Sequence, residues 1–273
     1  MRHGSDRTRL LEELRVIAVA AGAIVWTHFK SGCAADVKAD LSPVTVADRE
    51  AEALILQGLA RVAPGIPVVA EEEAAAGRVP EVSDRYFLVD PLDGTKEFVN
   101  GGTDFTVNIG LIEDGRPILG VVYAPARSLL YWGDVVSPEA WSAPQTPGEQ
   151  IGIARAIRVR QPGERLCAVA SKSHNTVETE AWLAAAGVSD RVSIGSSLKF
   201  ALVASGEADV YPRPAPTMEW DTAAGDAVLR AAGGRVFDLD GAPLTYGKPG
   251  YFNPGFVATG PYDPAPLRPF MKG

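Results

Sequence analysis

Cysteine and histidine are scarce in this 273-residue chain, which contains two and three of them respectively. Cys33 and Cys167 lie far apart and form no Cys-x-x-Cys pair, so the sequence predicts neither a zinc site nor a disulfide framework. The three histidines, His3, His28 and His174, are too scattered for a histidine-rich metal centre. Two buried thiols in a reducing compartment are the simpler interpretation of the cysteines.

Basic residues are also in deficit, since 26 Lys and Arg face 34 Asp and Glu, which leaves a net charge of −8. A protein of this charge repels polyanions, so the sequence excludes long nucleic acid as an expected partner. A small anion could still bind through a metal or a local basic pocket. The remaining composition, 46% hydrophobic and 22% charged, is that of an ordinary globular protein of one large or two moderate domains.

Long hydrophobic runs are absent, and the longest candidate is the apolar run over residues 16–26. This run is shorter than the roughly 20 residues that span a bilayer, so no transmembrane segment is expected. It resembles a secretory signal, but Glu12 and Glu13 precede it and no clean cleavage site follows. We therefore expect a helix over residues 6–30 packed in the core, and a protein located in the cytoplasm or peripherally on the inner face of the membrane.

The pattern of elements changes along the chain. The first half combines two helices with buried strands and a hairpin that turns at Asp114-Gly115, and the second half alternates strands with helices, as in α/β layering. The segment over 137–161 is rich in Pro, Gly and Gln and is the best candidate for a junction. The sequence thus predicts an N-terminal metal-binding domain over 1–155 and a C-terminal domain over 156–273 that completes the active site.

Acidic residues follow two buried strands and open one helix. Glu71 follows "PVVA", Asp90 and Asp93 follow "YFLV", and Asp221 begins "DTAAGDAVLRAAGG". Each acid alone is more simply an N-cap or a solvated charge. If they gather at one edge, however, they repel one another unless a cation lies between them, and carboxylate oxygens suit Mg²⁺ or Mn²⁺.

The segment "DPLDGTKEF" adds a second device to this pattern. Its proline stiffens a turn, and Gly94 allows the backbone to approach a ligand closely. The following "TKEFV" can start a helix, whose free N–H groups attract phosphate. Carboxylates beside such a helix start suggest metal-assisted phosphoryl chemistry.

Four motifs together resemble the magnesium-dependent, lithium-sensitive phosphatase superfamily that includes inositol monophosphatase. They are "SPVTVAD", "AEEE", "DPLDGTKEF" and "WDTAAGDAV", and the resemblance covers nearly the whole chain. It implies an α/β (α+β) fold, the layered αβαβα sandwich of the inositol monophosphatase and fructose-1,6-bisphosphatase type. It also implies direct in-line attack by water on a phosphomonoester, without a covalent phosphoenzyme.

The resemblance also implies roles for individual residues. It gives Asp48, Thr95 and Glu71 catalytic roles, with the pair of Asp48 and Thr95 orienting and deprotonating the attacking water. Two or three Mg²⁺ ions would be held by Glu71, Asp90, the carbonyl of Leu92, Asp93 and Asp221. Asp93 and Asp221 match ligands of the metal at the leaving group, and the other three match ligands of the metal nearer the nucleophile.

Within the superfamily, "SKSH", "IGSSLKF" and "YPR" look most like bisphosphate nucleotidases of the CysQ type. His174, Ser197, Lys199 and Arg213 match positions that contact the nucleotide and its other phosphate. The full set of substrate-binding residues that the resemblance implies is Glu71, Leu92, Asp93, Gly94, Thr95, His174, Ser197, Lys199, Arg213 and Asp221. The expected reaction removes the 3′-phosphate of 3′-phosphoadenosine 5′-phosphate, or of its phosphosulfate form, to leave AMP or adenosine phosphosulfate.

Two alternatives remain open at this point. The chain could act as an inositol monophosphatase or a fructose-1,6-bisphosphatase, or it could be a non-catalytic nucleotide-binding regulator. Arg213 between two prolines favours the nucleotidase, because inositol-preferring relatives usually have a glutamate at or beside that position. Glu73, a third glutamate in "AEEE", and the long segment over 143–155 depart from the family pattern.

Overall fold

The structure is a computed structural model, and the residues it describes are 2–32, 35–37, 43–170, 176–188 and 190–271. His174, predicted as a substrate contact, lies outside the described residues. Within them, no helix is long and apolar enough to cross a membrane.

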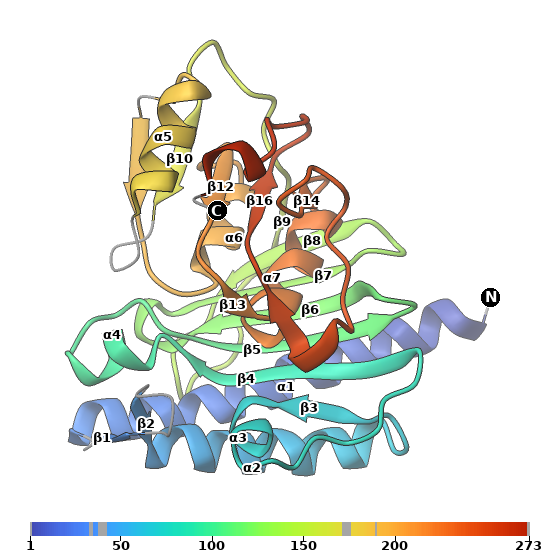
Figure 1. Cartoon of the computed structure of the whole chain (residues 1–273). Coiled ribbons are helices and arrows are strands. Elements are labelled where there is room, and N and C mark those ends of the chain that lie inside the picture. Colours follow the sequence, from blue (N-terminus) through green and yellow to red (C-terminus); the bar gives the residue numbers. More distant parts are fainter. Residues whose placement is uncertain (1, 33–34, 38–42, 171–175, 189, 272–273) are drawn as a thin grey trace.

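A seven-stranded sheet forms the centre of the first half of the chain (Figure 1). Its strands lie in sequence order, with β3 parallel to β4 and every later pair antiparallel. Their bounds are β3 (Val68–Ala70), β4 (Arg85–Asp93), β5 (Thr106–Glu113), β6 (Arg116–Ala124), β7 (Leu129–Asp134), β8 (Glu139–Pro144) and β9 (Arg155–Ile157). The hairpin between β5 and β6 turns at Asp114 and Gly115, both at positive φ, as predicted.

A five-stranded sheet forms the centre of the second half, in the order β11-β10-β12-β16-β14. Its strands are β10 (Cys167–Ala170), β11 (Asp190–Ser193), β12 (Val210–Arg213), β14 (Arg235–Phe237) and β16 (Phe256–Thr259). Two small ribbons complete the strands: β1 (Ala35–Val37) with β2 (Pro43–Thr45), and β13 (Thr217–Met218) with β15 (Phe252–Asn253).

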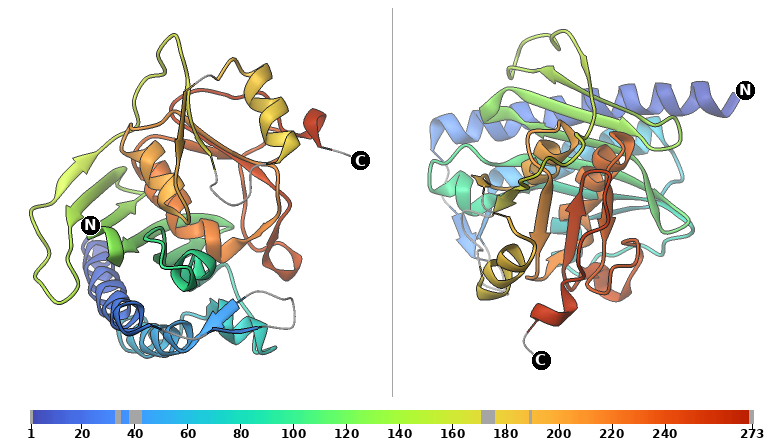
Figure 2. Two further views of the ribbon diagram at one scale, coloured as in Figure 1. Left: turned by 90° about the vertical axis from the view of Figure 1, so that its left-hand side faces the viewer. Right: turned by 90° about the horizontal axis from the view of Figure 1, so that it is seen from above.

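Helices cover both sheets and separate them. Two long helices, α1 (Arg2–Ser31) and α2 (Val46–Val62), lie together on one face of the seven-stranded sheet (Figure 2). On its other face α6 (Leu198–Ala204) and α7 (Glu219–Ala231) lie between the two sheets, and α5 (Val177–Ala185) covers the outer side of the second sheet. The short helices α3 (Glu71–Ala75) and α4 (Thr95–Val99) follow strand ends. The predicted five-layer αβαβα sandwich is therefore confirmed.

The apolar N-terminal run belongs to α1, as predicted. Its core-facing residues Leu14, Ile17 and Val25 are at most 3% exposed and pack with α2 against the sheet. At Gly22 the helix backbone lies directly against the ring of Tyr123 on β6, so closely that a side chain at Gly22 would overlap the ring. The run is therefore a structural element of the first layer.

The segment over 137–161, predicted as a loose junction, contains two strands that sequence reasoning missed. Strand β8 pairs with β7, where Trp132 faces Trp141, and β9 adds the last strand to the sheet. Pro147, Gly148 and Gly152, which suggested a loop, lie in the connection between these strands, and Pro144 is the last residue of β8. The predicted boundary between 155 and 156 falls within β9, and the division into two domains stays a prediction.

Helix α7 lies unusually close to the sheet because of a row of glycines. Gly110, Gly120 and Gly133 face one another across β5, β6 and β7. A Cβ added at Gly110 would lie 2.8 Å from an alanine Cβ of α7, and a Cβ added at Gly133 would lie 2.7 Å from a second alanine Cβ of that helix. A Cβ added at Gly120 would overlap the carbonyl oxygen of Ala224. Side chains at these three positions would push α7, which carries the predicted site residue Asp221 in its first turn, away from the sheet.

The glycine row yields a first prediction. Gly120→Ala should destabilise the protein by about 1–3 kcal/mol, because overpacking a tight core forces backbone shifts. The matched control is Gly163→Ala, where the nearest atom to the added Cβ is 3.9 Å away. Urea unfolding followed by circular dichroism measures both variants, and equal stability of the two would contradict the close packing of α7.

Candidate active site

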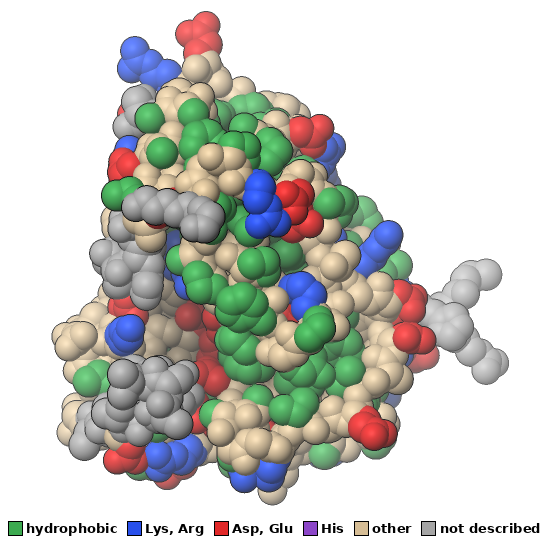
Figure 3. All heavy atoms as spheres, viewed as in Figure 1, with side chains coloured by type: hydrophobic (Ala, Val, Ile, Leu, Met, Phe, Trp, Pro, Cys, Tyr) green, Lys and Arg blue, Asp and Glu red, His purple; other side chains and the backbone are tan. Residues whose placement is uncertain are grey.

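A cavity of about 250 Å³ opens between the two halves of the chain, at the ends of β4 and β12 and the starts of α4, α6 and α7. Figure 3 shows acidic side chains gathered in a hollow on the face that Figure 1 presents. Most of the predicted site residues line this cavity, namely Glu71, Asp93, Gly94, Thr95, Ser197, Lys199, Arg213 and Asp221. Residues that are far apart in the sequence are thus brought to one place.

Asp48 and Thr95, the predicted water-activating pair, are in contact. Asp48 lies in the first turn of α2, is 1% exposed, and its Oδ1 accepts a hydrogen bond of 3.2 Å from Thr95 Oγ1. Its other oxygen, Oδ2, accepts from the backbone N of Thr45 at 2.7 Å and from the Thr45 hydroxyl at 2.6 Å, which caps α2. Both interpretations of Asp48, as a helix cap and as a catalytic residue, are therefore compatible with its position.

A bulge in β4 arranges the "DPLD" segment. The pairing with β5 shifts register between Asp90 and Asp93, and the backbone N of Leu92 donates to Asp90 Oδ1 at 2.9 Å. Thr95 Oγ1 also lies 3.0 Å from the carbonyl oxygen of Leu92. The turn thereby directs the carboxylates of Asp90, before the bulge, and Asp93, after it, toward the same end of β4.

Burial and neighbouring carboxylates raise the pKa of two acids of this site, Asp90 and Asp221. The pKa of Asp90 lies well above its usual value because of burial first, then the charges of Glu71, Asp93 and Asp221 and a hydrogen bond with Glu71. Burial, followed by the charge of Asp93, raises the pKa of Asp221 to about 6. The four acids therefore form one electrostatic unit.

Asp93 and Asp221 are linked by Ser197, from the start of α6. The backbone N and the hydroxyl of Ser197 lie 2.6 and 2.9 Å from Asp93 Oδ2, and the same hydroxyl lies 2.8 Å from the carbonyl oxygen of Asp221. The carboxylate of Asp221 accepts hydrogen bonds from the hydroxyl of Thr217 and from the backbone N of Met218. Ser197 thus ties the "DPLD" turn to the start of α7.

Gly94 joins β4 to α4 at φ 95°, in the left-handed region that favours glycine. A Cβ at this position would lie 2.7 Å from the carbonyl oxygen of Asp104, so any side chain would force the segments apart. Glycine is therefore required here both by its backbone angle and by the close approach of the neighbouring chain.

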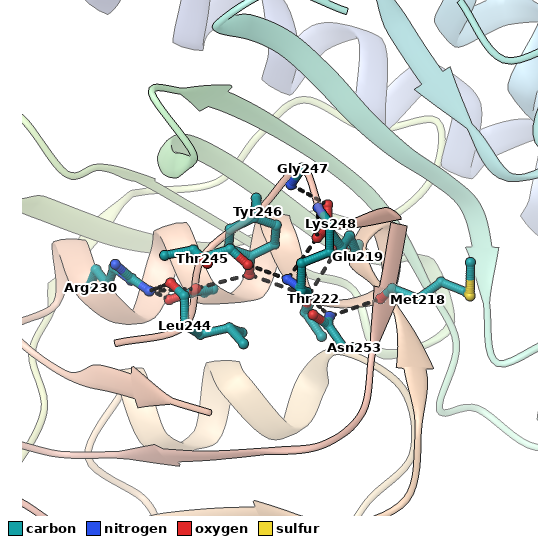
Figure 4. A network of polar contacts seen from close by, with 11 residues as sticks. Met218, Glu219, Thr222, Arg230, Leu244, Thr245, Tyr246, Gly247, Lys248 and Asn253 are labelled. Atoms are coloured by element: carbon teal, nitrogen blue, oxygen red, sulfur yellow. Dashed lines mark hydrogen bonds and ion pairs between the residues drawn. The ribbon is translucent and has the colours of Figure 1, made fainter. Parts of the chain in front are cut away.

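A polar network anchors the first turn of α7 (Figure 4). Glu219, which is fully buried, accepts hydrogen bonds from the backbone N of Gly247 at 2.8 Å and of Lys248 at 3.0 Å, and forms an ion pair with Lys248 Nζ at 2.7 Å. The Nδ2 atom of Asn253 donates to the hydroxyl of Thr222 at 3.0 Å. These contacts connect the segment before β16 to the helix turn that carries Asp221.

The two basic residues predicted for the second phosphate also line the cavity. Lys199 is 4% exposed, and its Nζ lies 5.4 Å from the centre of the Tyr211 ring. Arg213 donates from a terminal nitrogen to the carbonyl oxygen of Pro216 at 3.3 Å, and its buried Nε has no partner among the described residues. Both cations are therefore placed where an anion in the cavity could reach them.

Sequence reasoning missed several residues of the site. Thr217, which holds the carboxylate of Asp221, lies on a two-residue strand that no pattern indicated. Glu52 is 3% exposed and accepts hydrogen bonds from the backbone N atoms of Glu72 at 2.8 Å and Glu73 at 2.9 Å. Burial raises the pKa of Glu52 to about 7. The only signal for it was its position one helical turn after Asp48.

The donor set fits a hard cation, since it consists of carboxylate oxygens that destabilise one another when ionised together. Protein donors bind one oxygen, Oδ2, of each of the Asp93 and Asp221 carboxylates. In the part of the chain that the structure describes, no three His, Cys, Asp or Glu side chains form a ready ligand group.

Comparison with known proteins agrees with this geometry. Residues 6–259 match the model of the family described as "Inositol monophosphatase family". The chain is 45% identical to "3'(2'),5'-bisphosphate nucleotidase CysQ" of Shigella flexneri, covering 90% of this chain and 98% of that protein. A protein of the same name from Haemophilus influenzae is 30% identical over 92% of this chain and 93% of its own length.

Solved structures agree as well. CysQ from Bacteroides thetaiotaomicron, described as "a bacterial member of the inositol monophosphatase family", superposes with a TM-score of 0.77 at 36% identity, covering 93% of this chain and 98% of that one. An inositol monophosphatase from Anabaena superposes with a TM-score of 0.73 at 26% identity, covering 93% and 92%. The resemblance inferred from the motifs is confirmed, and the chain belongs to the inositol monophosphatase family.

Proposed function

We propose that this chain is a 3′(2′),5′-bisphosphate nucleotidase that removes the 3′-phosphate of 3′-phosphoadenosine 5′-phosphate, or of its phosphosulfate form. The observation that carries this proposal is the cavity, which is lined by Thr95, by the carboxylates of Glu71, Asp93 and Asp221, and by two cations, Lys199 and Arg213. Behind this lining, the buried Asp48 accepts a hydrogen bond from Thr95, and the buried Asp90 feels the charges of the three carboxylates. The names of the Shigella flexneri and Haemophilus influenzae relatives support the same reaction.

The chemistry of the donors indicates which groups would hold Mg²⁺. The oxygen ligands for two or three ions would come from Glu71, Asp90, the carbonyl of Leu92, Asp93 and Asp221. When bound, Mg²⁺ lowers the pKa of the attacking water and neutralises charge on the phosphate and the leaving oxygen. It would also remove the mutual repulsion that raises the pKa of Asp90 and Asp221.

Residues of the chain carry out the remaining steps. The hydroxyl of Thr95, which donates to Asp48, is placed to accept a hydrogen bond from the attacking water and relay its proton toward that carboxylate. Gly94 and Thr95 line the cavity at the start of α4, where their backbone would lie against the phosphate. Asp48 thus acts as the general base through Thr95, and no side chain becomes phosphorylated.

The choice of substrate depends on the second phosphate. A bisphosphate brings more negative charge than a sugar phosphate, and a chain of net charge −8 must balance that charge locally. Lys199 and Arg213 can do so, and the planar guanidinium of Arg213 suits forked contacts to phosphate. A location in the cytoplasm or against the inner face of the membrane stays a prediction.

Removal of one carboxylate charge tests the metal assignment. Asp93→Asn should lower the rate of phosphate release by roughly 100-fold or more, because a metal supplies several kcal/mol of charge stabilisation and each ~1.4 kcal/mol changes a rate tenfold. The control is Asp114→Asn in the β5–β6 turn, where asparagine tolerates the positive φ. Unchanged hydrolysis by Asp93→Asn would show that Asp93 holds no essential metal.

Replacement of Arg213 tests the substrate. Arg213→Gln should weaken binding of 3′-phosphoadenosine 5′-phosphate roughly 10- to 100-fold, the range expected for a lost charged hydrogen bond of about 1.5–3 kcal/mol. Adenosine 3′-monophosphate lacks the second phosphate, so its KM should change little. Arg116→Gln, on the exposed start of β6, is the matched control. Faster turnover of inositol 1-phosphate than of the bisphosphate by the unmodified protein would refute our choice of substrate.

Lithium provides a test that needs no variant. Li⁺ should inhibit phosphate release at a concentration where K⁺ has no effect, because it can replace a weakly held Mg²⁺ among these carboxylates. The comparison is made with purified protein at a fixed Mg²⁺ concentration, and EDTA should abolish the activity. Activity that persists in EDTA would exclude metal-assisted hydrolysis.

A further inference from the structure

Two buried polar side chains on β5 have no role in the reaction described above. Thr106 and Asn108 are two residues apart, so they point to the same face of the strand, and both are fully buried. Their neighbours Val107 and Ile109, on the opposite face, are equally buried and apolar. Polar groups at such positions need a structural or functional reason.

Both side chains contact the turn that begins α6. The hydroxyls of Thr106 and Ser196 lie 2.5 Å apart, and Asn108 Nδ2 donates to Ser197 Oγ at 3.0 Å. Ser196 has a φ of 58°, in the left-handed region that non-glycine residues rarely occupy. A turn in this conformation persists only where its surroundings hold it, and β5 provides two of the contacts that do so.

Because Ser197 is held in this turn, its hydrogen bonds fix the position of the Asp93 carboxylate. Its backbone N and hydroxyl both contact Asp93 Oδ2, and the hydroxyl also lies near the carbonyl oxygen of Asp221. A hydroxyl has one hydrogen to donate. Because Ser197 Oγ accepts from Asn108, its own hydrogen is directed away from β5, toward the two acidic residues.

We propose that Thr106 and Asn108 are positioning residues that hold the carboxylate of Asp93 in place for Mg²⁺ through Ser196 and Ser197. This inference rests on the proposed function, since it assumes that Asp93 holds a metal. Neither side chain lines the cavity, so both act through the serine turn.

The hydrogen bonding of Asn108 indicates that it does more than fill space. Its Oδ1 is buried and has no partner among the described residues. An unpaired buried acceptor destabilises a fold, and an apolar residue of similar size avoids that penalty. The Asn108→Val variant should therefore be at least as stable as the unmodified protein while holding Asp93 less well, an outcome that a purely structural role does not predict.

The experiment compares hydroxyl or amide removal with conservative replacement. Thr106→Val and Asn108→Val remove the polar groups that contact the serine turn, and Thr106→Ser and Asn108→Thr retain a hydroxyl at each position. The control is Thr259→Val, a fully buried threonine outside the cavity whose hydroxyl contacts the carbonyl oxygens of Gly260 and Tyr262, each at 3.0 Å. Calorimetric titration with Mg²⁺ alone, kinetics with 3′-phosphoadenosine 5′-phosphate, and urea unfolding are measured for each.

Both valine variants should raise the dissociation constant for Mg²⁺ about tenfold, as expected when the groups that orient a metal ligand are removed. Their kcat should fall at subsaturating Mg²⁺. The KM for the nucleotide should change by less than about twofold, because Lys199 and Arg213, the residues proposed to bind the second phosphate, are unchanged. Thr106→Ser and Asn108→Thr should recover Mg²⁺ binding. Thr259→Val should alter only the unfolding free energy.

Two results would overturn the inference. Unchanged Mg²⁺ binding in both valine variants would show that the serine turn does not position Asp93, and a rise in KM alone would show that the turn serves only the nucleotide. Thr106→Val keeps the size and shape of threonine, so the test does not depend on the folding of Asn108→Val. If the unmodified protein binds no Mg²⁺ or releases no phosphate, the proposed function itself fails, and that result is distinct from the other two.

Discussion

The close approach of α7 to the seven-stranded sheet is the constraint on which the rest of the structure depends. Gly110, Gly120 and Gly133 leave a track without side chains, and α7 lies in it. This contact joins the two halves of the chain, because α7 belongs to the second half and the sheet to the first (Figures 1 and 2). It also carries Asp221 to the end of β4, where Asp90 already lies. The three glycines thus allow the close approach of α7 that brings the four carboxylates together.

The active site concentrates negative charge in a place that water reaches poorly. Burial and mutual repulsion raise the pKa of Asp90 and Asp221, so the folded chain holds these groups in an unfavourable state. The surroundings compensate through fixed donors, such as the hydrogen bonds from Ser197 to Asp93 and the ion pair between Lys248 and Glu219. In the proposed function, a bound cation would balance the negative charge that the protein's own donors balance only in part.

The sequence predicted the parts of the site that local patterns encode. Asp90 and Asp221 could be recognised because acids at a strand end or a helix start produce a short-range signal. The order of the elements indicated α/β layering, and the five-layer arrangement came from the resemblance to the phosphatase superfamily. Asn108 could not be found in this way, since alternation along β5 indicates only that a position is buried and its partner Ser197 lies 89 residues away. Strands β8 and β9 were missed because their composition resembles that of a loop. They become strands through backbone pairing, β8 with β7 and β9 with β8.

Asp48 serves two purposes with its two oxygens, one at the start of α2 through Thr45 and one at the hydroxyl of Thr95. In the proposed reaction, the side chain that caps the start of α2 is therefore also the proton acceptor. A substitution at Asp48 would therefore change both the stability of the fold and the rate of the proposed reaction, so the two properties cannot evolve independently at this position. If a descendant of this chain lost catalysis and kept only binding, replacement of Asp48 would also remove the cap of α2. Such a chain would need another stabilising contact at that helix start.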